Sequence, residues 1–192
     1  MARRVRCGGM IAVLASMLVL LLPGSATAAA AADPPVRYTA WIDNAAIYEM
    51  RASYSWQCMD VRGESQNPGA VIQRFDCKGR LHQRFYFQPS GTPGLFMIGV
   101  YGRYCIGAQN AAVADGTPIV LGHCQGPGQH FRWVDRGNNH WEIVEAASGK
   151  CLMDTGRRSA IQLGACGNIN EPYPSLWTPV YDRQYNYTSV WG

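Results

Sequence analysis

The sequence has 192 residues, of which 47% are hydrophobic and 16% charged, and its formal net charge at pH 7 is +4. Three arginines within the first six residues supply most of that charge and no acid accompanies them, so the rest of the chain carries a net charge of +1. This balance, with the remaining basic residues scattered, excludes an electrostatic grip on nucleic acid. Beyond the first six residues the only adjacent basic pair is Arg157-Arg158, which we interpret as solvated surface charge.

The amino-terminal segment has the pattern of a secretory signal peptide. Its arginines precede an apolar stretch from Met10 to Leu22, and Ala26-Thr27-Ala28 offers small residues for cleavage. About 13 mostly apolar residues are too few to span a bilayer, which disfavours the alternative of a retained membrane anchor. We therefore expect residues 1–30 to be a signal peptide and residues 31–44 to be a leader that approaches the first strand. The mature protein is expected to be secreted, extracellular and not membrane-spanning.

Six cysteines divide the remaining chain into three similar units. Each unit opens and closes with a cysteine, and the opening cysteines lie 47 and 46 residues apart. An isoleucine stands five positions before each closing cysteine, at Ile72, Ile119 and Ile161. A repeat of this period indicates supersecondary units that cannot bury their apolar faces alone and must share one core.

An even number of cysteines in an exported chain indicates disulfides. Six cysteines allow 15 connectivities, and three equivalent units favour three equivalent bridges. The pairs expected are Cys58–Cys77, Cys105–Cys124 and Cys151–Cys166. A structural zinc site is the rival interpretation, but it needs closely spaced cysteine pairs that are absent here. We expect neither a metal nor a cofactor.

The local pattern within the units is strand and turn. Residues 84–88 and 95–98 are aromatic or apolar runs separated by turn-forming residues, and residues 131–134 and 140–144 repeat the arrangement. Outside the signal, no apolar period of 3.6 lasts for the roughly 10 to 12 residues that a helix needs. The sequence therefore predicts an all-β protein whose three units close around a pseudo-threefold axis.

Motifs in the first unit resemble one repeat of the ricin B-type lectin family of carbohydrate-binding modules. The motifs are Cys58–Gly63, Ile72–Cys77 and His82–Phe85, which match the family's Cys-x-Asp start, Gln-x-Trp-x-Cys middle and Gln-x-Trp end. The resemblance covers residues 45–180 and implies a β-trefoil of three pseudo-symmetric repeats, each with one intra-repeat disulfide. Residues 181–192 then form an aromatic C-terminal tail.

The resemblance also implies a carbohydrate-binding site in the first repeat, made of Asp60, Gln73, Phe75, His82 and Gln83. An ionised carboxylate accepts charge-assisted hydrogen bonds from sugar hydroxyls, and an aromatic ring covers the C–H face of a pyranose. Phe75 replaces the family's usual tryptophan, and His82 replaces an asparagine.

Several of these residues also have a purely structural interpretation. Asp60 could cap a turn, and Phe75 could be a packed residue. In the closing motif, glutamines such as Gln83 can satisfy buried backbone groups. The aromatic residues of that motif, Phe85, Phe131 and Trp177, are expected in the core.

The other two repeats lack the sugar-binding pattern. The second has glycine or valine at the matching positions Gly107, Val120 and Gly122. The third retains Gln162 but has Met153 and Gly164 at the other two. We therefore predict that only the first repeat has a competent pocket.

No motif of a known catalytic mechanism is present, and three scaffold repeats leave little chain for a cleft, so we expect no enzyme. The predicted function is a secreted lectin that binds a glycan or polysaccharide. The alternative is a protein-interaction trefoil, a toxin cell-binding subunit or an inhibitor, with degenerate sugar sites and a protein partner.

Overall fold

The computed structural model describes residues 46–167 and 175–186, with side chains up to residue 183, and all of them lie in the unit Pro34–Gly192. The predicted signal peptide, the leader and the last residues of the aromatic tail lie outside these ranges. Within them the chain forms strands and three single-turn 3-10 helices, η1 (Arg62–Glu64), η2 (Leu81–Gln83) and η3 (Gln109–Ala111), and no α-helix, which confirms the all-β prediction. The strands are β1 (Ala46–Ala52), β2 (Cys58–Val61), β3 (Ile72–Phe75), β4 (Phe85–Pro89), β5 (Phe96–Val100), β6 (Tyr104–Ala108), β7 (Ile119–His123), β8 (Phe131–Asp135), β9 (Trp141–Glu145), β10 (Cys151–Met153), β11 (Gln162–Gly164) and β12 (Leu176–Asn186).

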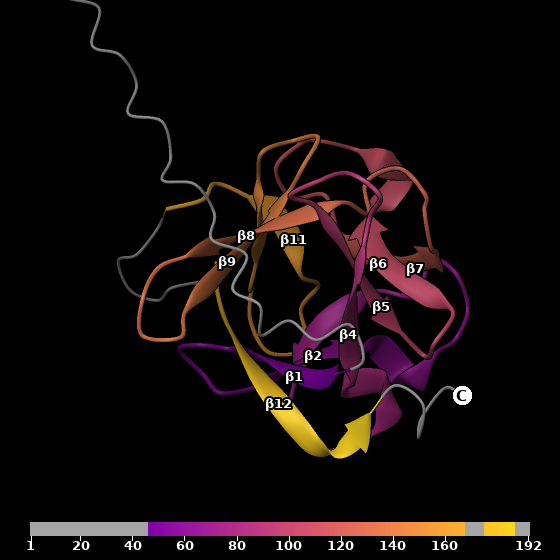
Figure 1. Ribbon diagram of the computed structural model, residues 1–192, viewed down its shortest axis with the longest axis vertical. Helices are drawn as coiled ribbons and strands as arrows, with labels where there is room; N and C mark the ends of the chain where they lie inside the picture. The colour runs from indigo at the N-terminus through magenta and orange to yellow at the C-terminus, as the bar shows by residue number, and fades with distance from the viewer. Residues whose placement is uncertain (1–45, 168–174, 187–192) are drawn as a thin grey trace, which may run out of the picture. The chain divides into compact units, whose positions relative to one another are not determined.

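The first and fourth strands of each repeat close into a ring. Around it the antiparallel neighbours are β1, β4, β5, β8, β9 and β12, and β12 pairs with β1 again. The closing pair reaches from Ala52 opposite Trp177 to Ala46 opposite Asn186, and Figure 1 shows yellow β12 beside indigo β1. The strand therefore continues past residue 180, where the sequence suggested the tail would begin. A closed ring leaves no unpaired edge to attract another chain.

The second and third strands of each repeat form hairpins, β2–β3, β6–β7 and β10–β11. The repeated isoleucines join these hairpins. The amide of Ile119 donates to the carbonyl of Ile161, and the amide of Ile161 donates to the carbonyl of Ile72, both at 2.8 Å. All three side chains are fully buried. Burial at this junction between repeats accounts for an apolar residue five positions before each closing cysteine.

The three disulfides have the predicted pairing, with Cα–Cα distances of 5.1, 4.8 and 5.1 Å. Each joins the first strand of a hairpin to a residue just after its second strand. Because all six cysteines are oxidised to disulfides, they hold no thiolate for a zinc ion.

The closing aromatics lie in the core as expected. Phe85, Phe131 and Trp177 are all 0% exposed, and the indole nitrogen of Trp177 donates to the carbonyl of Leu152 at 2.9 Å. Burying a side chain of this size contributes about 1.5–3 kcal/mol to stability. The packed core thus holds β1 and β4 in place, and the first-repeat hairpin and η2 lie between these two strands in the chain.

Candidate functional site

The predicted site residues come from three short elements of the first repeat. Asp60 on β2 lies directly opposite Gln73 on β3 in the antiparallel register. Phe75 ends β3, and η2 brings His82 and Gln83 beside β2. The hairpin and the following turn therefore gather all five residues, although they span more than twenty positions of sequence.

Three side chains hold the carboxylate of Asp60. Gln73 Nε2 donates to Oδ1 at 2.7 Å, and Gln83 Nε2 donates to Oδ2 at 2.8 Å. His82 Nε2 lies 3.1 Å from the same Oδ2 atom. Asp60 is only 2% exposed, and among the described residues no backbone amide donates to its side chain. These contacts orient the carboxylate in a fixed direction, in place of the turn cap that was the alternative.

A pocket of about 360 Å³ opens beside this carboxylate. Ligand sites in proteins typically enclose about 300–1,000 Å³, so the pocket is of the size that suits a small ligand. It contains four of the five predicted residues. Its lining consists of Asp60, Gly63, Glu64, Gln73, Phe75, Lys78 and His82.

Gln83 lies behind the pocket. It is 0% exposed, its Oε1 accepts from the amide of Lys78 at 2.6 Å, and its Nε2 also donates to the carbonyl of Asp76 at 2.9 Å. These contacts agree with the structural role considered for the closing glutamine, which is to satisfy buried backbone groups. Through the hydrogen bond to Asp60, Gln83 positions the carboxylate from the protein side.

His82 connects this pocket to a second cavity of about 400 Å³, which Glu64 and Tyr101 also line. The His82 ring is buried, and its Nδ1 lies 3.8 Å from Glu64 Oε1. Burial raises the pKa of Tyr101, and the nearby carboxylates of Glu64 and Asp60 raise it further. Sequence motifs did not point to Glu64, because it lies in η1 between the two strands of the hairpin, outside the three motifs that carry the resemblance.

Cations surround the ring of Phe75, which is half-buried. Lys78 Nζ lies 4.8 Å from the ring centroid, and the guanidinium carbons of Arg157 and Arg158 lie at 5.2 and 5.3 Å. The adjacent basic pair of the third repeat therefore contacts the candidate site of the first. In the sequence, only the adjacency of Arg157 and Arg158 set them apart from the other basic residues. The closed fold shows that the pair lies beside Phe75.

Asp76, next to Phe75, anchors one of these arginines. Its carboxylate accepts hydrogen bonds from Arg157 and, at 2.6 Å, from Gln57 Nε2. The hydrogen bonds from Arg157 and Gln57 lower the pKa of Asp76 to about 2. Asp76 is exposed, so this ion pair orders the edge of the site more than it stabilises the fold.

The matching positions in the second repeat are filled. A Cβ atom added to Gly107 would lie 2.5 Å from Cγ of Gln129 and 2.8 Å from the carbonyl oxygen of Gly128. Gln129 is buried, and its Oε1 accepts from the amide of Gly126 at 2.8 Å. The glutamine of the closing motif therefore occupies the space that a sugar-binding side chain would need at position 107.

The third repeat is filled differently. A Cβ atom at Gly164 would lie 2.7 Å from Cγ of Met153, so the methionine covers the position of the aromatic platform. The neighbouring Asp154 follows β10 and is directed to the first repeat, where its Oδ2 accepts from Arg74 Nη1 at 2.6 Å. Its carboxylate serves an ion pair between repeats.

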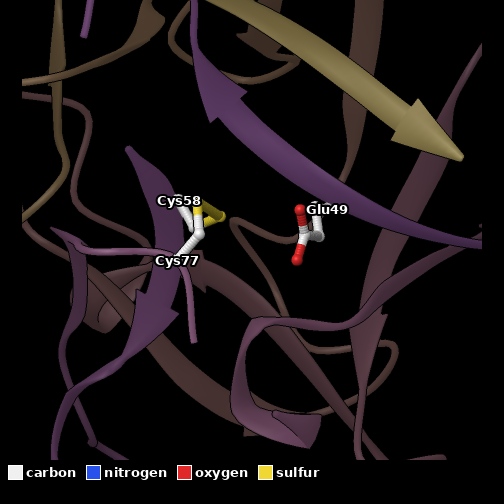
Figure 2. A group of neighbouring side chains, drawn as sticks. All are labelled: Glu49, Cys58 and Cys77. Atoms are coloured by element: carbon white, nitrogen blue, oxygen red, sulfur yellow. A yellow bond between two sulfur atoms is a disulfide. The ribbon is translucent and has the colours of Figure 1, made fainter. Parts of the chain in front are cut away.

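A second acidic group lies beside the first disulfide, where Figure 2 shows Glu49 facing Cys58 and Cys77. Burial acts to raise the pKa of Glu49, but hydrogen bonds from Arg51 and Arg84 outweigh it and leave the pKa below its usual value. Because the two sulfurs are bonded to each other, they offer no thiolate to a metal. This group is a structural ion pair in the barrel.

A closed six-strand ring capped by three hairpins is the architecture of a β-trefoil. The sequence model of one protein family, the ricin-type beta-trefoil lectin domain, matches residues 46–172 of this chain. The chain belongs to that family. No curated protein sequence matches the chain.

Solved structures agree on the fold. A designed threefold-symmetric protein, ThreeFoil, superposes with a TM-score of 0.61 at 21% identity, over 70% of this chain and 97% of that one. A ricin B-like lectin of Macrolepiota procera, solved with lactose, gives 0.55 at 19% identity, over 72% and 96%. An exo-β-1,3-galactanase of Clostridium thermocellum gives 0.64 at 23% identity, over 73% of this chain but only 31% of the enzyme.

Among the described residues, no helix has the length and apolar character needed to cross a membrane.

Proposed function

We propose that the protein is a secreted lectin whose first repeat holds its one competent sugar pocket, and that it binds without catalysis. Membership of a lectin family supports a carbohydrate-binding role in general. The Macrolepiota procera relative was solved with lactose, which agrees with such a role for this fold.

The observation that carries the proposal is the fixed carboxylate of Asp60 in the lining of the first-repeat pocket. Gln73 and Gln83 donate to this carboxylate, so its orientation does not have to be ordered when a sugar binds. Oδ2 is already contacted by Gln83 and His82, whereas Oδ1 accepts from Gln73 alone among the described residues and keeps a lone pair for a hydroxyl donor. Phe75 adds ring surface to the same pocket.

Secretion is supported by the three disulfides, which form and persist in oxidising compartments. The signal-like first 30 residues agree with export. We expect one pocket to bind a single sugar weakly, because few atoms are buried and hydroxyls exchange water for protein at little net gain. A polymeric glycan would raise the apparent affinity through several contacts.

A protein-interaction trefoil is the second candidate. Two large side chains of the β1–β2 loop favour it, since Tyr54 is 60% exposed and Trp56 is 56% exposed. Tyr181 on β12 is 52% exposed as well. Aromatic residues of this kind are enriched at protein interfaces.

The test is binding of the mature, oxidised protein to a panel of soluble glycans and insoluble polysaccharides, beside the variant Asp60→Ala. The matched control is Asp115→Ala in the second repeat, where the carboxylate is exposed and pairs only with Lys150 among the described residues. We expect Asp60→Ala to weaken binding at least about tenfold, because it removes a charged acceptor, and Asp115→Ala to change little.

Thermal melting of each variant shows whether the fold is kept. If the wild-type protein binds no glycan, or if both variants bind as it does, the lectin proposal fails. Binding of a protein partner that Trp56→Ala abolishes would then support the second candidate.

A further inference from the structure

We infer that the first-repeat pocket selects an acidic sugar, one whose ring carries a carboxylate or a sulfate. This inference rests on the proposed lectin function and adds the chemical class of the ligand. The anionic group would lie between Lys78 and Arg158 beside Phe75, while Asp60 accepts hydrogen bonds from hydroxyls of the same ring.

The first step is the positive charge at the aromatic platform. Lys78, Arg157 and Arg158 all lie within about 6 Å of the Phe75 ring centroid, the range of a cation–π contact. A platform for a neutral pyranose needs a free apolar face. Here charged groups from two repeats crowd the ring. A ligand at this ring would therefore contact the cations as well as the apolar ring face.

The second step is that part of this charge is not neutralised. Arg157 is bonded to Asp76. Neither Lys78 nor Arg158 has a carboxylate partner among the described residues, and both side chains are exposed. Arg62 likewise uses uncharged acceptors, Oε1 of Gln73 at 3.0 Å and the carbonyl of Arg158 at 3.1 Å. The patch of Lys78, Arg157 and Arg158 around the Phe75 ring therefore carries three positive charges against the one carboxylate of Asp76, although the mature chain as a whole is nearly neutral.

The third step is that the fold holds this patch in place. The amide of Arg158 donates to the carbonyl of Arg74 at 2.8 Å, and the amide of Arg74 donates to Ser159 at 3.3 Å. These bonds attach a turn of the third repeat to the edge of β3. Arg158 itself has φ 63°, a conformation uncommon for any residue but glycine.

The fourth step is the distribution of charge within one pocket. Asp60 and Glu64 line it together with Lys78. A neutral sugar could donate its hydroxyl protons to Asp60 but offer only uncharged oxygens to the cations, whereas an acidic sugar could also place a negative charge beside them. Arginine also presents a planar fork of donors that matches carboxylate and sulfate oxygens.

The test compares three probes built on galactose or its uronic acid, by isothermal titration calorimetry with the mature, oxidised protein. The first is an oligomer of galacturonic acid, the second is the same oligomer with its carboxylates methyl-esterified, and the third is a sulfated galactan oligosaccharide. Ester formation removes the charge and keeps the ring and its hydroxyls. We expect the galacturonic acid or the sulfated probe to bind about tenfold more tightly than the ester. The arm that shows the preference identifies the anion.

Two double variants localise the effect. In Lys78→Gln/Arg158→Gln we expect the ratio of acid to ester affinity to fall to within about twofold of one. The matched control, Arg132→Gln/Lys150→Gln, removes the same charge from the exposed Arg132 and the half-buried Lys150, neither of which lines the first-repeat pocket, and should keep the wild-type ratio. Melting curves confirm that both variants fold.

The inference fails if the wild-type protein binds acid, sulfate and ester equally, or if the preference survives in Lys78→Gln/Arg158→Gln. It also fails if the control variant loses the preference as completely, because the effect would then be general attraction between polyanion and protein. Ester binding that depends on Asp60 without any preference for the charged probes would keep the lectin proposal and reject this one. Absence of binding to all probes and to the whole glycan panel would reject both.

Discussion

Gln73 donates a 2.7 Å hydrogen bond to Asp60 from the directly opposite position of the neighbouring strand. The same amide accepts a 3.0 Å bond from Arg62, so a cation polarises the group that orients the carboxylate. The pairing register alone brings these residues together. We therefore expect the hairpin to act as a unit in binding.

Replacing Gln73 tests this relationship. In Gln73→Ala the carboxylate of Asp60 loses one donor, and we expect glycan affinity to fall about two- to tenfold with the fold retained. Gln162→Ala is the matched control, because Gln162 lies opposite Met153 in the same register of the third repeat. Titration calorimetry measures both. Equal losses in the two variants, or none in Gln73→Ala, would contradict a positioning role.

The first two disulfides should contribute equally to stability but differently to glycan binding. Each of Cys58–Cys77 and Cys105–Cys124 closes a separation of 19 residues, and we expect removal of either, as a double alanine variant, to cost about 3 kcal/mol. Only the first lies beside Asp60 and Phe75, so only its loss should also weaken glycan binding. Denaturant titration and binding assays check the two parts. Weakened binding in Cys105→Ala/Cys124→Ala would show that the pocket depends on the whole trefoil.

Glu142 is a buried acid that the fold requires. Its side chain is 0% exposed and accepts from Arg136, from Ser175 Oγ at 2.9 Å and from the amide of Gly167 at 2.6 Å. Glu142→Ala would leave those donors unpaired, and we expect a loss of about 3 kcal/mol in the free energy of unfolding. The exposed pair of Asp115 with Lys150 provides the comparison, because Asp115→Ala should cost less than about 1 kcal/mol. Similar losses by chemical denaturation would refute the difference.

Neighbouring atoms fill the space beside Gly107 and Gly122 in the second repeat, so we expect alanine substitutions there to differ in their effect on stability. Gly107→Ala would press on backbone atoms of Gly128, and we expect it to cost about 1–3 kcal/mol of stability. Gly122→Ala meets only the end of the Gln129 side chain, at 3.0 Å, and should cost less. Melting temperatures of the two variants give the order. The opposite order would mean that Gln129 is held more rigidly than the backbone beside Gly107.

Asp76 should titrate unusually low. Because its folded pKa of about 2 lies below the usual aspartate value of 3.8, its contribution to stability is present above pH 3.8 and is lost as the pH falls toward 2. NMR titration of the Asp76 carboxyl carbon measures this midpoint. In Arg157→Gln the midpoint should move back toward 3.8, since the main hydrogen bond is gone. An unchanged midpoint in that variant would assign the shift to Gln57 alone.

The sequence predicted features that recur between its units. The disulfide pairs, the two hairpins and the buried Phe85, Phe131 and Trp177 follow from repeated spacing, because a pattern written in each unit reports a shared structure. Four of the five predicted residues line one pocket, since the register of a hairpin is itself local.

Contacts between repeats could not be predicted in the same way. Arg157 and Arg158 are some eighty positions from Phe75, and only closure of the trefoil brings the third-repeat turn to β3. The position of Gln83 behind Asp60 also depends on η2, a single turn that no periodic pattern indicates. In both cases the information lies in tertiary packing.

The most direct test of the sugar pocket is residue-resolved NMR mapping of whichever panel glycan binds. If the first-repeat pocket binds the glycan, the side-chain amide signals of Gln73 and the ring signals of His82 shift on titration, while the side-chain signals of Gln129 and Gln162 stay in place. Shifts centred on Gln129 or Gln162, or on the exposed Tyr54 and Trp56, would contradict a single working pocket in the first repeat.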